Sequence, residues 1–325
     1  MYRYIIFIIG LGFLSGALHA EAPTAHRGSK IGVHLIGSYT SGSQKMIRGK
    51  MPILKILDLH QPMLDAARDY KAANPNGIVV LRCYTPVRYT LADNPFSTAD
   101  RYWNTYFKPQ MDKLSTSERK LIDYVEATNE MGECPTWEND RSIAWFTSFS
   151  IRWVSICVRE GFRPCLASIP VGNPGGDISE VKKKILKYTR ALRAAKRVGG
   201  AWSYHSYTIQ YTTDVGVELW YSLRYRKFYE AFKGPYSDLA DMPMILTEGG
   251  VDYGGNRDTD GWSARGSAEK FESWLRWFDS EIQKDPYVLG ITLFQNGDPQ
   301  NWKSFDLEPL SDWFMQYWDE SVVEK

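Results

Sequence analysis

The sequence predicts an α/β protein whose fold is a single (β/α)8 TIM barrel. Short apolar segments alternate with helix-period segments along the chain, a pattern typical of parallel strands joined by helices. Eight such apolar segments fall within about 290 residues, which is close to the size of a closed barrel of eight βα units. No linker or change in composition divides residues 28–320, so we expect one large domain there.

The predicted strands are rich in β-branched and other apolar residues, which suit the pleated backbone of a buried sheet. In chain order they are residues 31–37, 52–58, 77–84, 121–130, 164–171, 200–207, 243–248 and 289–294.

Helical patterns lie between these strands, and three have clear sequence signals. One starts at a capping box formed by Asp177 and Glu180. Another runs from about residue 140 to a stop at Gly161, and a third, residues 271–282, carries apolar and aromatic side chains on one face. In a barrel of this kind, reactive side chains lie at the carboxyl ends of the strands and in the loops that follow them.

The overall charge argues against a nucleic-acid partner. The chain has 39 Lys+Arg against 38 Asp+Glu, a formal net charge of +1, so it offers no basic field to neutralise phosphates. It also has 12 Trp, 20 Tyr and 14 Phe, and these rings either fill a large core or form platforms for sugar-like ligands. Composition alone does not separate the two uses.

The N-terminus resembles a secretory signal peptide. Arg3 supplies the positive region, residues 5–14 form an apolar run too short to span a bilayer, and small residues follow up to Ala20. We therefore expect residues 1–20 to be removed and the protein to be secreted or periplasmic. No later stretch reaches the ~18 apolar residues of a transmembrane helix, so no stable membrane insertion is expected after cleavage.

An exported protein meets oxidising conditions, in which cysteines can pair. The four cysteines are Cys83, Cys134, Cys157 and Cys165. A disulfide between Cys157 and Cys165 is favoured because they bracket a short helix-to-strand turn, and four buried thiols are the alternative. The five histidines are scattered without zinc-ligand spacing, so neither a metal nor an organic cofactor is expected.

Carboxylates at two strand ends are the main functional signal. The fourth predicted strand ends in Glu126 to Glu130, and alternation would place Glu126, Thr128 and Glu130 on one side. The seventh ends in Glu248, with Met244 and Leu246 on the same side. Strands four and seven lie across a small barrel from each other, so Glu130 and Glu248 should face one another over its mouth, as cleavage of a glycosidic bond requires. Glu126 should lie deeper, as an ion-pair partner.

These motifs, EATNE at 126–130 and TEG at 247–249, resemble those of clan A of the glycoside hydrolases, a group of (β/α)8 barrels. They do not distinguish between its families, such as 5 or 39. The resemblance implies that Glu130 is the acid/base, Glu248 the nucleophile and Asn129 a donor to the sugar 2-hydroxyl. It also implies that His205 and Tyr207, which match a His-x-Tyr element on strand six, line the catalytic subsite and orient the nucleophile.

Three features depart from the clan pattern and leave the substrate open. The strand-end arginine of the clan lies on strand two, whereas Arg82 falls on the third predicted strand. The Trp often found after strand eight is absent, and Trp302 is the nearest substitute. Residues 131–132 read MG where the clan usually has Pro. Arg82 and three loop or strand-end tryptophans, Trp137, Trp202 and Trp302, are the remaining candidates for binding sugar.

The predicted activity is hydrolysis of a β-linked oligo- or polysaccharide by double displacement. Glu248 would attack the anomeric carbon while Glu130 protonates the leaving oxygen, and Glu130 would then activate water. Two alternatives remain open at this stage: a non-catalytic carbohydrate-binding barrel, and a transglycosylase that uses the same carboxylates with a sugar as acceptor. The sequence has no Gly-x-Ser-x-Gly nucleophile elbow, which weighs against a serine hydrolase.

Overall fold

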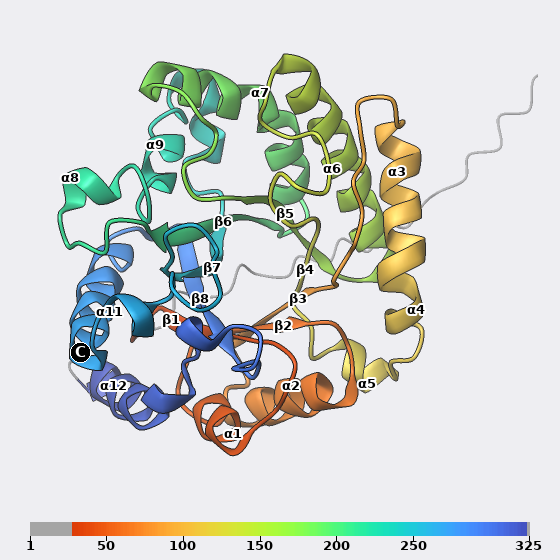
Figure 1. Ribbon diagram of the computed structural model, residues 1–325. Helices are drawn as coiled ribbons and strands as arrows, with labels where there is room; N and C mark the ends of the chain where they lie inside the picture. Colours follow the sequence, from red (N-terminus) through yellow and green to blue (C-terminus); the bar gives the residue numbers. More distant parts are fainter. Residues whose placement is uncertain (1–27, 324–325) are drawn as a thin grey trace, which may run out of the picture.

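The computed structural model describes residues 28–323, and these form the predicted (β/α)8 barrel (Figure 1). Its parallel strands pair in chain order, and β1 closes the barrel against β8. The strands are β1 (Ile31–Leu35), β2 (Ile53–Leu57), β3 (Ile78–Arg82), β4 (Tyr124–Glu126), β5 (Arg163–Ile169), β6 (Ala201–Thr208), β7 (Met244–Val251) and β8 (Val288–Asn296). Each of the eight overlaps a strand predicted from the sequence, although β4 is much shorter than the predicted residues 121–130.

Helices surround the barrel on its outside (Figure 1). The long ones are α2 (Gln61–Ala73), α6 (Asp140–Glu160), α7 (Ile178–Lys196), α11 (Ala268–Ile282) and α12 (Ser311–Val323). The shorter α-helices are α1 (Ser41–Ile47), α3 (Pro95–Tyr102), α4 (Lys108–Met111), α5 (Thr116–Arg119), α8 (Val215–Glu218), α9 (Tyr225–Tyr229) and α10 (Trp262–Arg265). A π-helical turn (Trp103–Phe107) joins α3 to α4, and 3-10 turns occur at Gly234–Leu239, Lys303–Phe305 and Glu308–Leu310.

The helix boundaries follow the predicted capping signals. The capping box of α7 is present, with the Asp177 side chain accepting from the Glu180 N–H and the Glu180 side chain accepting from the Asp177 N–H. The helix α6 begins after Asn139, whose side chain accepts from two free N–H groups of the first turn. It ends at Gly161, whose φ of 82° lies in the left-handed region that glycine adopts without steric cost.

Two apolar cores hold the fold together. The larger lies between the strands and the helices and contains most of the buried aromatic rings. The smaller lies inside the barrel and is formed by Ile53, Ile78, Val80, Tyr124, Cys165, Ala201 and Ile245. Because these inner residues come early in their strands, they fill the amino-terminal end of the barrel, and the polar side chains gather at the carboxyl end.

The predicted Cys157–Cys165 disulfide is wrong, since all four cysteines are buried free thiols. Cys165 points into the inner core of the barrel, whereas Cys157 on α6 belongs to the outer core, so the strand wall separates the two side chains. Burial raises the pKa of each thiol well above its usual value, which disfavours the reactive thiolate.

The predicted signal peptide, residues 1–20, lies outside the described residues. Among residues 28–323, no helix combines the length and the apolar character needed to cross a bilayer.

Candidate active site

Glu248 reaches the barrel interior because β7 contains a bulge. Ser203 on β6 pairs with Ile245, but His205 pairs with Glu248, so β7 has one residue more than β6 between these two pairs. Without the bulge Thr247 would pair with His205, and Glu248 would point outward to the helices. The predicted alternation was therefore wrong for this strand: Met244 and Leu246 belong to the outer core, and Glu248 points the opposite way.

Gly249, which follows Glu248, permits close pairing of β6 and β7. A Cβ atom at this position would lie 2.7 Å from the carbonyl oxygen of Ser206, a distance that real Cβ atoms do not adopt. The TEG motif thus combines a bulge, a carboxylate and a close backbone contact.

Glu130 reaches the mouth through a loop and not through strand alternation. The strand β4 ends at Glu126, and both Thr128 and Glu130 have left-handed backbone angles, with φ of 63° and 57°. Non-glycine residues pay a steric cost for this conformation, and such cost concentrates at functional sites. The Thr128 N–H donates to the Tyr102 hydroxyl at 3.0 Å, which helps to hold the turn.

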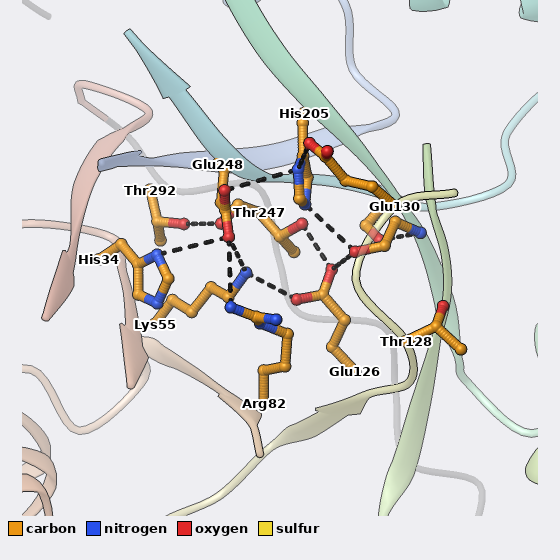
Figure 2. A network of polar contacts seen from close by, with 12 residues as sticks. His34, Lys55, Arg82, Glu126, Thr128, Glu130, His205, Thr247, Glu248 and Thr292 are labelled. Atoms are coloured by element: carbon orange, nitrogen blue, oxygen red, sulfur yellow. Dashed lines mark hydrogen bonds and ion pairs between the residues drawn. The ribbon is translucent and has the colours of Figure 1, made fainter. Parts of the chain in front are cut away.

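The two carboxylates meet at one histidine nitrogen. The Nδ1 atom of His205 lies 2.8 Å from Glu130 Oε1 and 3.5 Å from Glu248 Oε2 (Figure 2). Since both oxygens lie near the same nitrogen, they are at most about 6.3 Å apart, a limit that includes the ~5–5.5 Å between the carboxyls of retaining glycosidases. This spacing is compatible with direct attack by one carboxylate on the sugar.

Besides His205, two cationic groups and one hydroxyl lie close to the Glu248 carboxylate. Lys55 Nζ lies 3.2 Å and Arg82 NH2 3.8 Å from Oε1, while the Tyr207 hydroxyl donates to Oε2 at 3.1 Å. Burial alone would raise the pKa of Glu248, but the charges of His205, Lys55 and Arg82 outweigh burial and hold that pKa well below its usual value. Glu248 is therefore ionised, as a nucleophile must be, whereas the Glu130 side chain is 40% exposed and lies nearer to solvent.

Lys55 is the main site residue that sequence reasoning missed. It is completely buried and lies 2.7 Å from Glu126 Oε2 as well as near Glu248, so one ammonium serves two carboxylates. Lysine is almost never fully buried unless it is paired. The sequence does contain a signal for this site: Lys55 stands in the middle of the apolar strand ILKIL. Its side chain points to the same side of the strand as Ile53, into the barrel.

Glu126 lies deeper in the barrel and forms the predicted ion pair, with Lys55 as its partner. Its Oε1 accepts from the hydroxyls of Thr247 at 2.6 Å and Ser168 at 3.1 Å. The Ser168 hydroxyl in turn lies 3.1 Å from His205 Nε2, so the histidine ring is held at both nitrogens. Ser168 reaches this position through a second bulge, on β5, where its φ is 43°.

The charge on His205 predicts a pH dependence of stability. Burial tends to lower the pKa of His205, but Glu248 and Glu130 raise it above the usual value of 6.5. A raised pKa stabilises the folded protein fully below pH 6.5, and that contribution is lost as the pH rises through the folded-state pKa. The free energy of unfolding lost in His205→Gln should therefore be larger at about pH 5.5 than at about pH 8.5. Urea unfolding of both proteins at the two pH values measures it, and a loss that grows with pH would contradict the assignment.

A pocket of about 420 Å³ lies beside Glu248, because its wall includes His34 and Arg82, each 3.8 Å from that carboxylate. It is lined by His34, Ile36, Gly37, Leu57, Asp58, His60, Arg82, Tyr84, Asn129, Glu133, Arg257, Phe294, Asp298 and Trp302. Three of the predicted substrate-binding residues, Arg82, Asn129 and Trp302, thus lie on its wall. Arg82 is on β3, as counted from the sequence, so the departure from the clan pattern stands, and β2 carries Lys55 instead.

Several polar atoms of this pocket have no partner within the described part of the chain. The atoms without a hydrogen-bond partner are Asn129 Oδ1, Arg82 Nε and both ring nitrogens of His34, although His34 Nδ1 lies 3.8 Å from Glu248 Oε1. Burial, the largest influence, and the nearby charge of Lys55 hold the pKa of His34 well below its usual value, so its ring is neutral. Buried polar atoms normally have partners, so these groups are available to the hydroxyls of a ligand. His34, in the apolar strand IGVHL, was a second residue missed from the sequence.

Two of the three predicted sugar platforms are wrong. Trp137 is 1% exposed and packs against Phe146 and Tyr188, and Trp202 is fully buried against the aromatic residues of α9. Trp202 faces outward because it alternates with the inward Ser203 and His205 on β6. Neither ring presents a face to the pocket. Trp302 does line the pocket, and the Arg257 guanidinium lies 4.9 Å from its ring centroid.

Within residues 28–323, no three His, Cys, Asp or Glu side chains are arranged to hold a metal ion. The chemistry available at the site is that of its carboxylates, with His205, Lys55 and Arg82 as charged neighbours.

Comparison with known proteins identifies the fold. No protein-family model matches the chain, and no curated protein matches it. Among solved structures, the endo-β-1,4-mannanase of Thermotoga petrophila is 11% identical, with a TM-score of 0.50 over 92% of this chain and 78% of that one. A calcium-binding mutant of β-glucuronidase 2 from Bacteroides uniformis is 13% identical, with a TM-score of 0.50 over 91% of this chain and 34% of that one. At such identities the likeness shows a shared barrel fold, and these two examples of that fold are glycosidases.

Proposed function

We propose that this protein is a retaining glycoside hydrolase that cleaves a β-linked oligo- or polysaccharide, of the clan A type. The observation that carries the proposal is the pair Glu130 and Glu248, held by one His205 nitrogen at 2.8 and 3.5 Å at the carboxyl end of the barrel. A pocket with unpartnered polar atoms next to this pair supports a hydroxyl-rich substrate.

We propose different roles for the two carboxyl groups. Glu248, ionised and 10% exposed, attacks the anomeric carbon, while Glu130 gives its proton to the leaving oxygen as the glycosidic bond breaks. The resulting glycosyl ester on Glu248 is then attacked by water. Glu130 takes one proton from that water, the ester bond breaks, and the sugar leaves with its original anomeric configuration.

The environment of Glu248 supports each step. Arg82, Lys55 and the Tyr207 hydroxyl keep the carboxylate ionised and oriented before attack and stabilise it again as the ester breaks. His205 contacts both carboxyls and therefore fixes their relative position. Asn129, Trp302 and His34 would bind the sugar from the pocket wall.

Product analysis on a polysaccharide array, with a panel of fluorogenic β-glycosides, tests this function. We expect turnover of at least one substrate and a first product of retained configuration, observed by NMR before mutarotation. Binding without turnover of any substrate would indicate a carbohydrate-binding barrel, and an inverted product would refute the double displacement. Longer products at high acceptor concentration would indicate transglycosylation from the same ester.

We also propose that the protein is exported, on the basis of the N-terminal pattern of residues 1–20. Expression of the full chain followed by N-terminal sequencing of the extracellular and periplasmic fractions tests this. Full-length protein confined to the cytoplasm would contradict export.

A further inference from the structure

A second surface groove lies beyond the end of β6, in the segment that carries α8. Its volume is about 690 Å³, and it is lined by Gln210, Thr212, Asp214, Gly216, Val217, Trp220 and Tyr221. Because this segment follows the carboxyl end of β6, the groove opens at the same end of the barrel as the two carboxylates. In Figure 1, α8 lies at the outer edge of the barrel. None of the residues that line this groove lines the catalytic pocket.

Two buried cations, Arg224 and Lys227, lie against the ring of Trp220, which lines this groove. Arg224 is 3% exposed and Lys227 is 4% exposed, whereas Trp220 is 39% exposed. Lys227 Nζ lies 3.4 Å and the Arg224 guanidinium carbon 5.5 Å from the Trp220 ring centroid. One surface indole thus covers two positive charges.

Neither cation forms an ion pair with any residue of the described chain. Arg224 donates to the Pro174 carbonyl at 2.6 Å, but its buried Nε has no hydrogen-bond partner. Glu230, an acid near Lys227, is held by Lys182 at 2.8 Å. The neighbouring Arg226 shows the usual arrangement, since it pairs with both Glu281 and Asp285.

Burying two unpaired like charges side by side is unfavourable. Burial lowers the pKa of Arg224 and of Lys227, and the charge of Arg224 lowers the pKa of Lys227 further. Contact with the face of Trp220 offsets part of this cost. An anion would offset much more, because it would restore the missing counter-charge in a poorly solvated place.

We propose that Lys227 and Arg224, beside Trp220, bind an oxyanion carried by a glycan, either a uronic acid carboxylate or a sulfate ester. The groove is larger than a single oxyanion needs, and the side chains of Gln210, Thr212 and Tyr221 offer hydrogen bonds to neighbouring sugar hydroxyls. The glycan part of this inference rests on the proposed function, since a glycan bound there would be presented to the catalytic end of the barrel. The inference that an anion binds there rests only on the two buried cations, Lys227 and Arg224.

Calorimetric titration of the Glu248→Gln protein tests the proposal, because that variant prevents turnover during the measurement. The probes are three oligosaccharides of equal length, one sulfated, one of uronic acids and one neutral, together with inorganic sulfate. We expect an anionic oligosaccharide to bind more tightly than the neutral one, and Lys227→Met to weaken its binding at least ~10-fold. The matched control Lys182→Met removes a nearby lysine that is already paired and should change binding less than ~2-fold.

Two further variants show whether a loss of binding in Lys227→Met comes from the lost charge or from misfolding. Lys227→Arg keeps the positive charge and should keep the binding, and Arg224→Gln should weaken it independently. Equal binding of anionic and neutral oligosaccharides, or unchanged binding in folded Lys227→Met and Arg224→Gln, would overturn the proposal. Binding of inorganic sulfate without binding of either anionic oligosaccharide would overturn the assignment to a glycan.

The failure of this inference is distinguishable from failure of the proposed function. Lys227→Met in the otherwise native chain should hydrolyse a small fluorogenic glycoside at the native rate, because such a substrate does not extend beyond the catalytic pocket. If no glycoside is hydrolysed but Lys227-dependent binding is present, the anion site stands without the hydrolase. If hydrolysis occurs without that binding, only the anion site is refuted.

Discussion

Glu248→Gln is expected to lower kcat on every substrate by ~10³-fold or more while the barrel stays folded. The amide is nearly the same size as the carboxylate but is a very poor nucleophile, so the glycosyl ester does not form. The fold should tolerate the change because Lys55 keeps its contact with Glu126 at 2.7 Å. Steady-state kinetics with circular dichroism and thermal unfolding measure both parts of this prediction.

Glu130→Gln should give a different pattern, which separates the roles of the two carboxyls. Without a proton donor, substrates with poor leaving groups should lose ~10²–10⁴-fold in rate, whereas an activated aryl glycoside needs little protonation and should still form the ester. Such a substrate should show a burst of released aryl alcohol in Glu130→Gln and no burst in Glu248→Gln. Glu269→Gln on the exposed surface of α11 is the matched control. Native activity in either active-site variant would refute the assignment.

Lys55→Met is expected to destabilise the protein by about 3–5 kcal/mol, the largest stability effect we predict for a single side chain. The change leaves Glu126 fully buried without the ammonium that lies 2.7 Å from it and removes a charge from beside Glu248. Loss of that charge should also raise the pKa of Glu248, so the acid limb of the pH–activity profile should move to higher pH. Urea unfolding and a pH–rate profile measure the two effects.

A double variant tests whether the cost of Lys55→Met comes from the unpaired carboxylates. Lys55→Met combined with Glu126→Gln should be less destabilised than the sum of the single variants, because a neutral amide can still accept from Thr247 and Ser168. The exposed pair Lys108–Asp112 supplies a control, since Lys108→Met should cost less than about 1 kcal/mol. Additive effects in the double variant would mean that Lys55 stabilises the barrel by packing alone.

The strands could be predicted from the sequence because each is a short apolar run bounded by turn residues and helical patterns. Eight such runs that pair in parallel are typical of a closed barrel. In a barrel the carboxyl ends of all strands lie at one end, which places Glu130 and Glu248 together. The carboxylates were therefore located correctly, although their catalytic roles remain predictions. The reason given for their orientation was wrong, because strict alternation does not foresee the bulge before Glu248 or the left-handed backbone of Thr128 and Glu130.

Other features depend on three-dimensional packing that periodicity does not contain. Trp137 and Trp202 lie next to loops or strand ends in the sequence, yet both rings fill the outer core. Lys55 and His34 look like interruptions of apolar strands until the structure places them beside Glu248. A polar residue at an inward position of a buried strand indicates the site better than a tryptophan near a loop does, since a buried polar group requires a partner.

The extra residue in β7 turns two neighbouring side chains, those of Thr247 and Glu248, toward the barrel interior. Deleting Leu246 would bring β6 and β7 into uninterrupted pairing and would leave Glu248 opposite His205, but Thr247 would then face the helices. Glu126 would lose the hydrogen bond from the Thr247 hydroxyl, so the bulge lets one strand supply both a carboxylate and the donor that supports a second, buried carboxylate.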